Sequence, residues 1–121
     1  MSKEFVETHT VSGATPLLEA AVMEAIASDM PTIIDFWTDG CHACHVLGPI
    51  MDEFADAHRG VINVYKVDVE EATILREAVR IRFLPTIGFF VSGKDRGWHE
   101  GSCDLSELAA LAKEHFWDFG L

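Results

Sequence analysis

The chain has 121 residues, of which 49% are hydrophobic and 24% charged, and its formal net charge is −11. This size and composition predict one soluble domain with a substantial core, and the acidity argues against nucleic acid or an anionic membrane surface as a partner. No apolar run is long enough to cross a bilayer and no signal-peptide pattern opens the chain, so we expect a cytoplasmic protein.

Hydrophobic periodicity divides the chain into alternating strands and helices. In chain order we predict a weak strand at 5–11, a helix at 14–29, a strand at 32–37, a helix from 41 or 42 to 60, a strand at 61–69, a helix at 70–81, a strand at 86–93, a short strand around 98 and a helix at 104–119. Strands that alternate with helices need crossover connections, which give a parallel core, and the last two strands form an antiparallel hairpin. The sequence therefore predicts an α/β fold with a mixed central sheet of about five strands, flanked on both faces by about four helices.

Local signals mark several ends of these elements. Thr15 and Pro16 fit the N-cap and first position of the first helix, and Asp104 and Glu107 have the spacing of a capping box. Pro49 falls inside the second helix and should kink it. The polar segment 92–97 (SGKDRG) is predicted to be the turn before the last strand.

Residues 41–45 read CHACH, a pattern that fits more than one kind of site. C-x-x-C-H attaches a c-type haem, whereas C-x-x-C is the spacing of a redox-active dithiol. A zinc site is a third interpretation, but zinc needs two further ligands. The candidates are His42, His45 and His58, and His42 and His45 would point away from a site shared with both cysteines. Without a signal peptide, a structural disulfide framework is not expected, and a close cysteine pair favours redox or metal chemistry.

Five features in a fixed order make the chain similar to the thioredoxin family over essentially its whole length. They are DFW before the loop into C-x-x-C, Pro49 five residues after the second cysteine, YKVDV with Lys66, LPT at 84–86, and EGSCDLSEL with Gly101. The haem interpretation explains none of the other four. The resemblance implies that residues 1–121 form a single thioredoxin-like domain, and that the protein is a thiol–disulfide oxidoreductase whose redox centre is a Cys41–Cys44 disulfide, with no other cofactor and no metal.

The resemblance gives four residues distinct catalytic roles. Cys41 lies at a helix start, where unpaired N–H groups and the macrodipole favour the thiolate that attacks a substrate disulfide, and Cys44, one turn along, resolves the mixed disulfide. Asp35 interrupts an apolar strand, so we predict a buried carboxyl with a raised pKa that accepts the proton of Cys44; a carboxylate reaching water at the strand end is the alternative. Lys66 is the predicted ionic partner of Asp35, unless it is simply solvated.

Further residues are assigned to the surface that meets the substrate. The resemblance implies a cis peptide bond between Leu84 and Pro85, in a turn that lies against the dithiol, and places Gly101 in a neighbouring loop. Gly40 occupies the position where the family usually has Trp, which changes the docking surface. Trp37 precedes the dithiol loop, so its fluorescence should change on oxidation.

Two residues near the dithiol each have two interpretations. His42 and the following Ala replace the usual Gly-Pro pair, and a protonated imidazole beside Cys41 would stabilise the thiolate and raise the reduction potential. A solvated His42 with little effect is the alternative. Cys103 is either a packed, inert thiol or a regulatory one.

The predicted enzyme acts on protein disulfides, receives electrons from a reductase or another thiol donor, and serves electron transport and cell redox homeostasis; we expect a monomer. An alternative from a different class is a thioredoxin-fold binding or chaperone module dedicated to one partner protein.

Overall fold

The computed structural model describes residues 8–11 and 16–121 of the chain. In chain order its elements are β1 (Thr8–Val11), α1 (Pro16–Ala27), β2 (Thr32–Trp37), α2 (His42–Ala57), β3 (Asn63–Asp68), α3 (Thr73–Val79), β4 (Thr86–Val91), β5 (Lys94–Glu100), α4 (Leu105–His115) and the 3-10 helix η2 (Trp117–Phe119). The predicted N-cap at Thr15 and the beginning of the first predicted strand lie outside the described residues.

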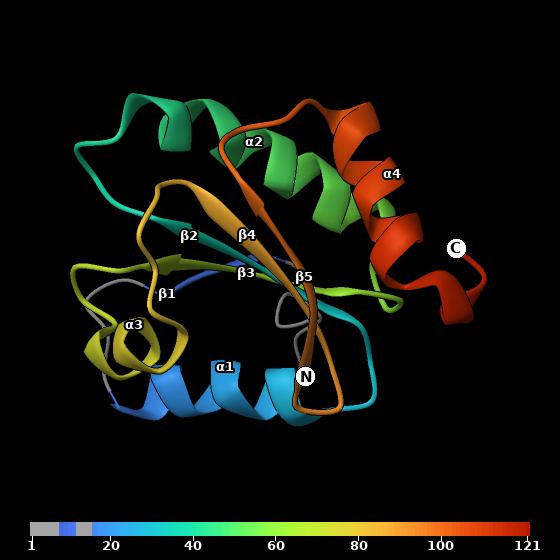
Figure 1. Cartoon of the computed structure of the whole chain (residues 1–121), viewed down its shortest axis with the longest axis horizontal. Helices are drawn as coiled ribbons and strands as arrows, with labels where there is room; N and C mark the ends of the chain where they lie inside the picture. Colours follow the sequence, from blue (N-terminus) through green and yellow to red (C-terminus); the bar gives the residue numbers. More distant parts are fainter. Residues whose placement is uncertain (1–7, 12–15) are drawn as a thin grey trace.

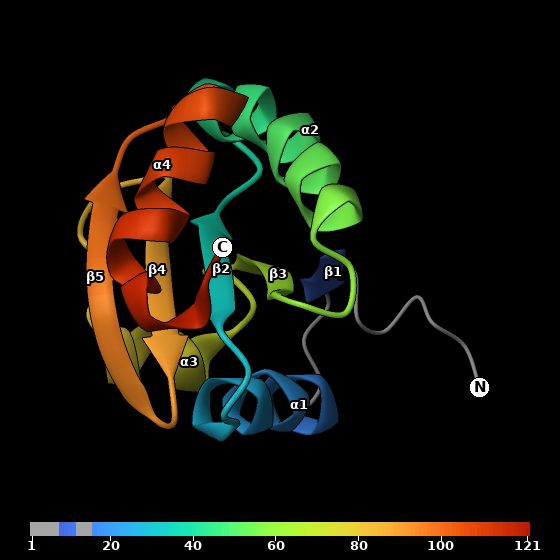
Figure 2. The ribbon, with the colours of Figure 1, turned by 90° about the vertical axis from the view of Figure 1, so that its right-hand side faces the viewer.

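The five strands form one mixed sheet in the order β1-β3-β2-β4-β5. β1, β3 and β2 are parallel, while β4 is antiparallel to both β2 and β5. Helices α2 and α4 cover one face of the sheet and α1 and α3 cover the other (Figures 1 and 2). This confirms the predicted mixed sheet of about five strands between two helical layers.

Each face of the sheet has its own hydrophobic core. The core under α2 and α4 contains Ile33, Leu47, Phe54, Ile87, Phe89, Leu108 and Phe116, and the core under α1 and α3 contains Val22, Ile34, Phe36, Val67, Leu75 and Phe90. Successive side chains of a strand point to opposite faces, as Ile33 and Ile34 do. Asp35 therefore faces the same side as Ile33, toward α2.

The hairpin between β4 and β5 differs from the prediction. Ser92 and Gly93, with φ of 53° and 81°, form a two-residue turn, and residues 94–97 already belong to β5. A turn with positive φ at both positions matches the right-handed twist of the two strands, so no longer loop is needed. The prediction of a turn at 92–97 was wrong because β5 is an edge strand, where polar residues are tolerated.

The ends of the helices follow local backbone geometry. Asp104 caps α4 and forms the predicted capping box with Glu107, in which both hydrogen bonds measure 2.8 Å. All four helices end earlier than predicted: α1 at Ala27, α2 at Ala57, α4 at His115, and α3 at Val79, where Arg80 takes a left-handed φ of 55°. None of these differences moves the start of α2, which positions the two cysteines.

Candidate active site

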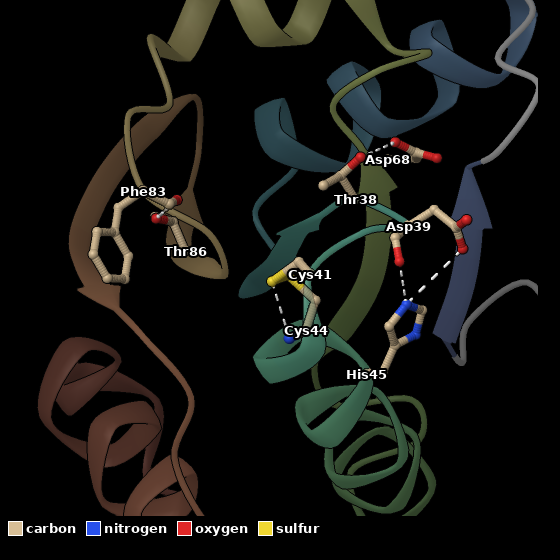
Figure 3. The surroundings of a disulfide bond; sticks show 8 residues. All are labelled: Thr38, Asp39, Cys41, Cys44, His45, Asp68, Phe83 and Thr86. Carbon is tan, nitrogen blue, oxygen red and sulfur yellow. Dashed lines mark hydrogen bonds and ion pairs between the residues drawn. A yellow bond between two sulfur atoms is a disulfide. The ribbon is translucent and has the colours of Figure 1, made fainter.

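The two cysteines of CHACH lie at the N-terminus of α2 and form a disulfide, with Cα atoms 5.2 Å apart (Figure 3). Cys41 is the N-cap residue, and its Sγ accepts a hydrogen bond of 3.2 Å from the backbone N–H of Cys44. Cys41 is partly exposed, whereas Cys44 is 3% exposed. A reaction partner can therefore reach Cys41, while Cys44 faces the interior.

A cavity of about 320 Å³ extends from Cys44 toward the sheet. Its walls include Asp35, Trp37 and Lys66 from the strands and Cys44, Pro49 and Asp52 from α2. Asp35 is 1% exposed, and neither of its carboxyl oxygens has a hydrogen-bond partner among the described residues. Burial raises the pKa of Asp35 from 3.8 to about 7, the charge of Lys66 opposes this change, and that of Asp52 adds to it. Near neutral pH this carboxyl can accept a proton.

Lys66 is a charged neighbour of Asp35, but its direct ion pair is with another carboxyl group. Lys66 lies opposite Asp35 in the parallel register of β2 and β3, but its Nζ pairs with Asp52 Oδ1 at 2.9 Å. The direct ion pair of Lys66 is therefore with Asp52, while its charge acts on Asp35 through space and lowers the pKa of that carboxyl. The Lys66 side chain is only 18% exposed, so the solvated alternative does not hold either.

The loop before Cys41 is tied to the first turn of α2 by His45. The Nε2 atom of His45 donates a hydrogen bond of 2.6 Å to the backbone oxygen of Asp39, as Figure 3 shows. The ring of Trp37 meets that of His45 edge-on, with centroids 6.0 Å apart. Gly40 is exposed, and a Cβ atom added there would meet nothing within 4 Å, so the family's Trp position is open surface in this chain.

The segment before β4 completes the surroundings of the disulfide. The Leu84–Pro85 peptide bond is cis, as the resemblance implied, and Pro85 O accepts a hydrogen bond of 2.8 Å from the backbone N–H of Gly101. That bond joins the turn to the loop before α4. Phe83, which the sequence analysis did not single out, is 51% exposed next to this turn (Figure 3).

The structure also bears on His42 and Cys103. His42 is exposed on the first turn of α2. Cys103 is 6% exposed, and burial together with the acidic side chains around it raises the pKa of its thiol to about 11. A thiol that stays protonated near neutral pH is a poor nucleophile, which favours the packed, inert interpretation.

In the part of the chain that the structure describes, no group of three or more His, Cys, Asp or Glu side chains is placed to hold a metal ion. No helix among residues 16–121 has the length and apolar character needed to span a membrane.

Asp52 was not predicted from the sequence as a site residue, and His45 was considered only as a zinc ligand, although one signal could have indicated Asp52. Cys44, Gly48 and Asp52 are spaced i, i+4 and i+8, which puts them on one face of α2. That spacing indicates a carboxyl below the dithiol. The reach of Lys66 from β3 to Asp52 depends on how the helix crosses the sheet, which the spacing does not contain.

Comparison with known proteins places this fold and cysteine pair among the thiol–disulfide oxidoreductases. Residues 14–114 match the family model described as Thioredoxin, and the chain belongs to this family. It is 30% identical over 92 residues to "Thioredoxin 1" of Nostoc sp., covering 76% of this chain and 86% of that protein. It is 33% identical over 93 residues to the thioredoxin of Malassezia sympodialis, covering 76% and 88%.

A solved structure supports the same assignment. The crystal structure of Malassezia sympodialis thioredoxin (Mala s 13) matches with a TM-score of 0.76 and 28% sequence identity, covering 90% of this chain and 91% of that one. The predicted thioredoxin fold and oxidoreductase class are confirmed.

Proposed function

We propose that this protein exchanges a Cys41–Cys44 dithiol with disulfides of protein substrates. The observation that carries the proposal is the arrangement of three groups: Cys41 partly exposed at the N-terminus of α2, Cys44 buried behind it, and Asp35 in the cavity below, with a pKa of about 7. The thioredoxin family acts on protein disulfides, which supports the same substrate class for this chain.

In the first step, the Cys41 thiolate attacks one sulfur of the substrate disulfide. The substrate S–S bond breaks, a mixed disulfide forms, and the other substrate sulfur leaves as a thiolate. The backbone N–H of Cys44, which contacts Cys41 Sγ at 3.2 Å in the disulfide form, is suitably placed to stabilise the Cys41 thiolate, as is the helix macrodipole.

In the second step, Cys44 gives its proton to the carboxylate of Asp35 and attacks the sulfur of Cys41. The bond between Cys41 and the substrate breaks, the Cys41–Cys44 disulfide forms, and the second substrate sulfur leaves. Two electrons have then passed from the enzyme to the substrate, whose thiolates take up two protons. Because the dithiol carries both electrons, the reaction needs no metal and no organic cofactor.

The substrate is proposed to lie along the cis turn at Leu84 and Pro85, between Gly101 and the open surface at Gly40. Phe83 adds an exposed aromatic ring next to that turn, and it offers the apolar contact that Gly40 lacks. We further propose a monomer that works in the cytoplasm and is returned to the dithiol form by a reductase or another thiol donor.

Reduction of insulin with dithiothreitol as electron donor tests the proposal. Wild-type protein should accelerate the reduction, Cys41→Ser should be inactive, and Cys44→Ser should accumulate a mixed disulfide that mass spectrometry detects. A wild-type protein that binds a partner but does not accelerate insulin reduction would favour the binding or chaperone module instead.

A further inference from the structure

Beside the dithiol, one ammonium group acts on two carboxyl groups but pairs directly with only one of them. Lys66 lies opposite Asp35 in the sheet, yet its Nζ is 2.9 Å from Asp52 Oδ1. The Asp52 side chain is 56% exposed, whereas Asp35 is 1% exposed and has no hydrogen-bond partner among the described residues. The direct ion pair thus goes to the carboxyl that water already stabilises, and the buried carboxyl is left without one.

We propose that Asp52 is a positioning residue for the proton transfer from Cys44, because it holds the Lys66 ammonium on the solvent side of the cavity and away from a direct ion pair with Asp35. This inference rests on the role of Asp35 in the proposed function. Asp35 touches the reacting proton, whereas Asp52 acts only through Lys66 and through its own charge.

Two alternative arrangements of charge show why the position of Lys66 matters. An ammonium paired directly with Asp35 would stabilise the carboxylate and make it a weaker base. A cavity without the ammonium would hold the carboxyl protonated through the neutral range, so that it could not accept a proton. Asp52 keeps Lys66 near enough to Asp35 to reduce the rise in pKa that burial causes, but not near enough to cancel that rise.

Among the charged groups around the cavity, Lys66 and Asp52 are the two whose charges shift the pKa of Asp35. The titratable groups that line the cavity or interact with Asp35 are Lys66 on β3, Cys44, His45 and Asp52 on α2, and Cys103 before α4. His45 is bound to the backbone of Asp39, and the pKa of Cys103 is raised to about 11, so this thiol is neutral near pH 7. Besides burial, the effects that set the pKa of Asp35 come from Lys66, which lowers it, and Asp52, which raises it.

The test compares Asp52→Asn and Lys66→Met, which should shift the same pH profile in opposite directions. The rate at which Cys44 resolves a preformed mixed disulfide is measured by rapid mixing from about pH 5 to about pH 9. At about pH 6, Asp52→Asn should raise this rate about two- to threefold, because more Asp35 is ionised, and Lys66→Met should lower it by a similar factor. Above about pH 8, Asp52→Asn should be slower than wild type, because its Asp35 is the weaker base.

A second measurement needs no turnover. Carbon-13 NMR of the Asp35 carboxyl in the oxidised protein should show titration at lower pH in Asp52→Asn and at higher pH in Lys66→Met. Asp52→Glu keeps the charge and should retain the wild-type profile. Asp56→Asn is the matched control, because Asp56 is also exposed on α2, one turn further along, and pairs with Arg59 instead.

The outcomes separate this inference from the proposed function. If Asp52→Asn lowers the rate equally at every pH, or leaves the Asp35 titration in place, Asp52 has no positioning role. If Asp35→Asn resolves the mixed disulfide slowly while Asp52→Asn matches wild type, only the inference about Asp52 fails. If Asp35→Asn resolves at the wild-type rate, the role of Asp35 itself is wrong.

Discussion

Replacing Asp35 with Asn should make the folded protein more stable at neutral pH. The carboxyl is 1% exposed and accepts no hydrogen bond from the described residues. Replacing it with Asn therefore breaks no hydrogen bond to these residues. Asn has nearly the same shape and cannot ionise. The substitution therefore removes one property, the free energy needed to hold a charge in the cavity under α2.

The size of the effect follows from the pKa of Asp35, which burial raises from 3.8 to about 7. Between these pH values the folded state binds more protons than the unfolded state, so the free energy of unfolding falls as the pH rises. Below about pH 4 Asp35 is protonated in both states, and no free energy of unfolding is lost. Above about pH 7 Asp35 is ionised in both states, and the loss of unfolding free energy is complete. Since each pKa unit corresponds to about 1.4 kcal/mol, the full loss is about 4 kcal/mol, and Asp35→Asn should avoid it.

Urea unfolding of the oxidised proteins, followed by far-ultraviolet circular dichroism, measures this difference at about pH 3.5, pH 5.5 and pH 8. The advantage of Asp35→Asn over wild type should grow across this series. Asp68→Asn is the control: Asp68 is also buried, but its Oδ1 accepts a hydrogen bond of 2.9 Å from the backbone N–H of Glu70. Asn can still accept this bond, but as a neutral acceptor it forms a weaker one, so this variant should lose about 1 kcal/mol at pH 8 instead of gaining stability. An advantage of Asp35→Asn that does not change with pH would show that the buried charge of Asp35 is not its cause.

Three further predictions concern other parts of the molecule. In the reduced protein, a short iodoacetamide pulse at neutral pH should label Cys41 first, because Cys44 and Cys103 are 3% and 6% exposed; faster labelling of Cys44, seen by mass mapping, would reverse their roles. Glu19 of α1 accepts hydrogen bonds of 3.0 and 3.1 Å from two N–H groups at the start of α3, so Glu19→Ala should lower the free energy of unfolding by about 1–3 kcal/mol in urea titrations, and Glu19→Gln by less. His42→Ala should lower the reduction potential by at most about 30 mV at low salt and about pH 6, measured against glutathione, since an exposed charge is screened; a fall that persists at high salt would contradict this.

The order and type of the elements could be predicted because they depend on local patterns. The alternation of Ile33 and Ile34 between the two cores is a period-two pattern, and the capping box at Asp104 and Glu107 is a local contact. The turn at Ser92 and Gly93 was placed too broadly, because polar composition does not separate an edge strand from a loop.

In the active site, too, the features that depend on local sequence could be predicted, and a contact between distant elements could not. The helix start at Cys41 and the burial of Asp35 follow from the sequence around each residue. The contact between Lys66 and Asp52 joins β3 to α2, and its geometry depends on how closely the helix packs on the sheet. Long side chains reach several ångströms from their backbone, so the choice of Lys66 between two carboxyl groups could be seen only in the folded structure.

The stability lost at Asp35 and its use as a base have the same physical origin. Burial that makes the carboxylate costly also raises the proton affinity of the carboxyl to the range where it can take the proton of Cys44. Asp35→Asn should therefore gain stability at neutral pH and lose the rate of resolution together. Lys66→Met, which raises the proton affinity of Asp35, should deepen the fall in stability with pH, and Asp52→Asn should lessen it. The same two charges that set the pH profile of the reaction thus set how much folding free energy the active site costs.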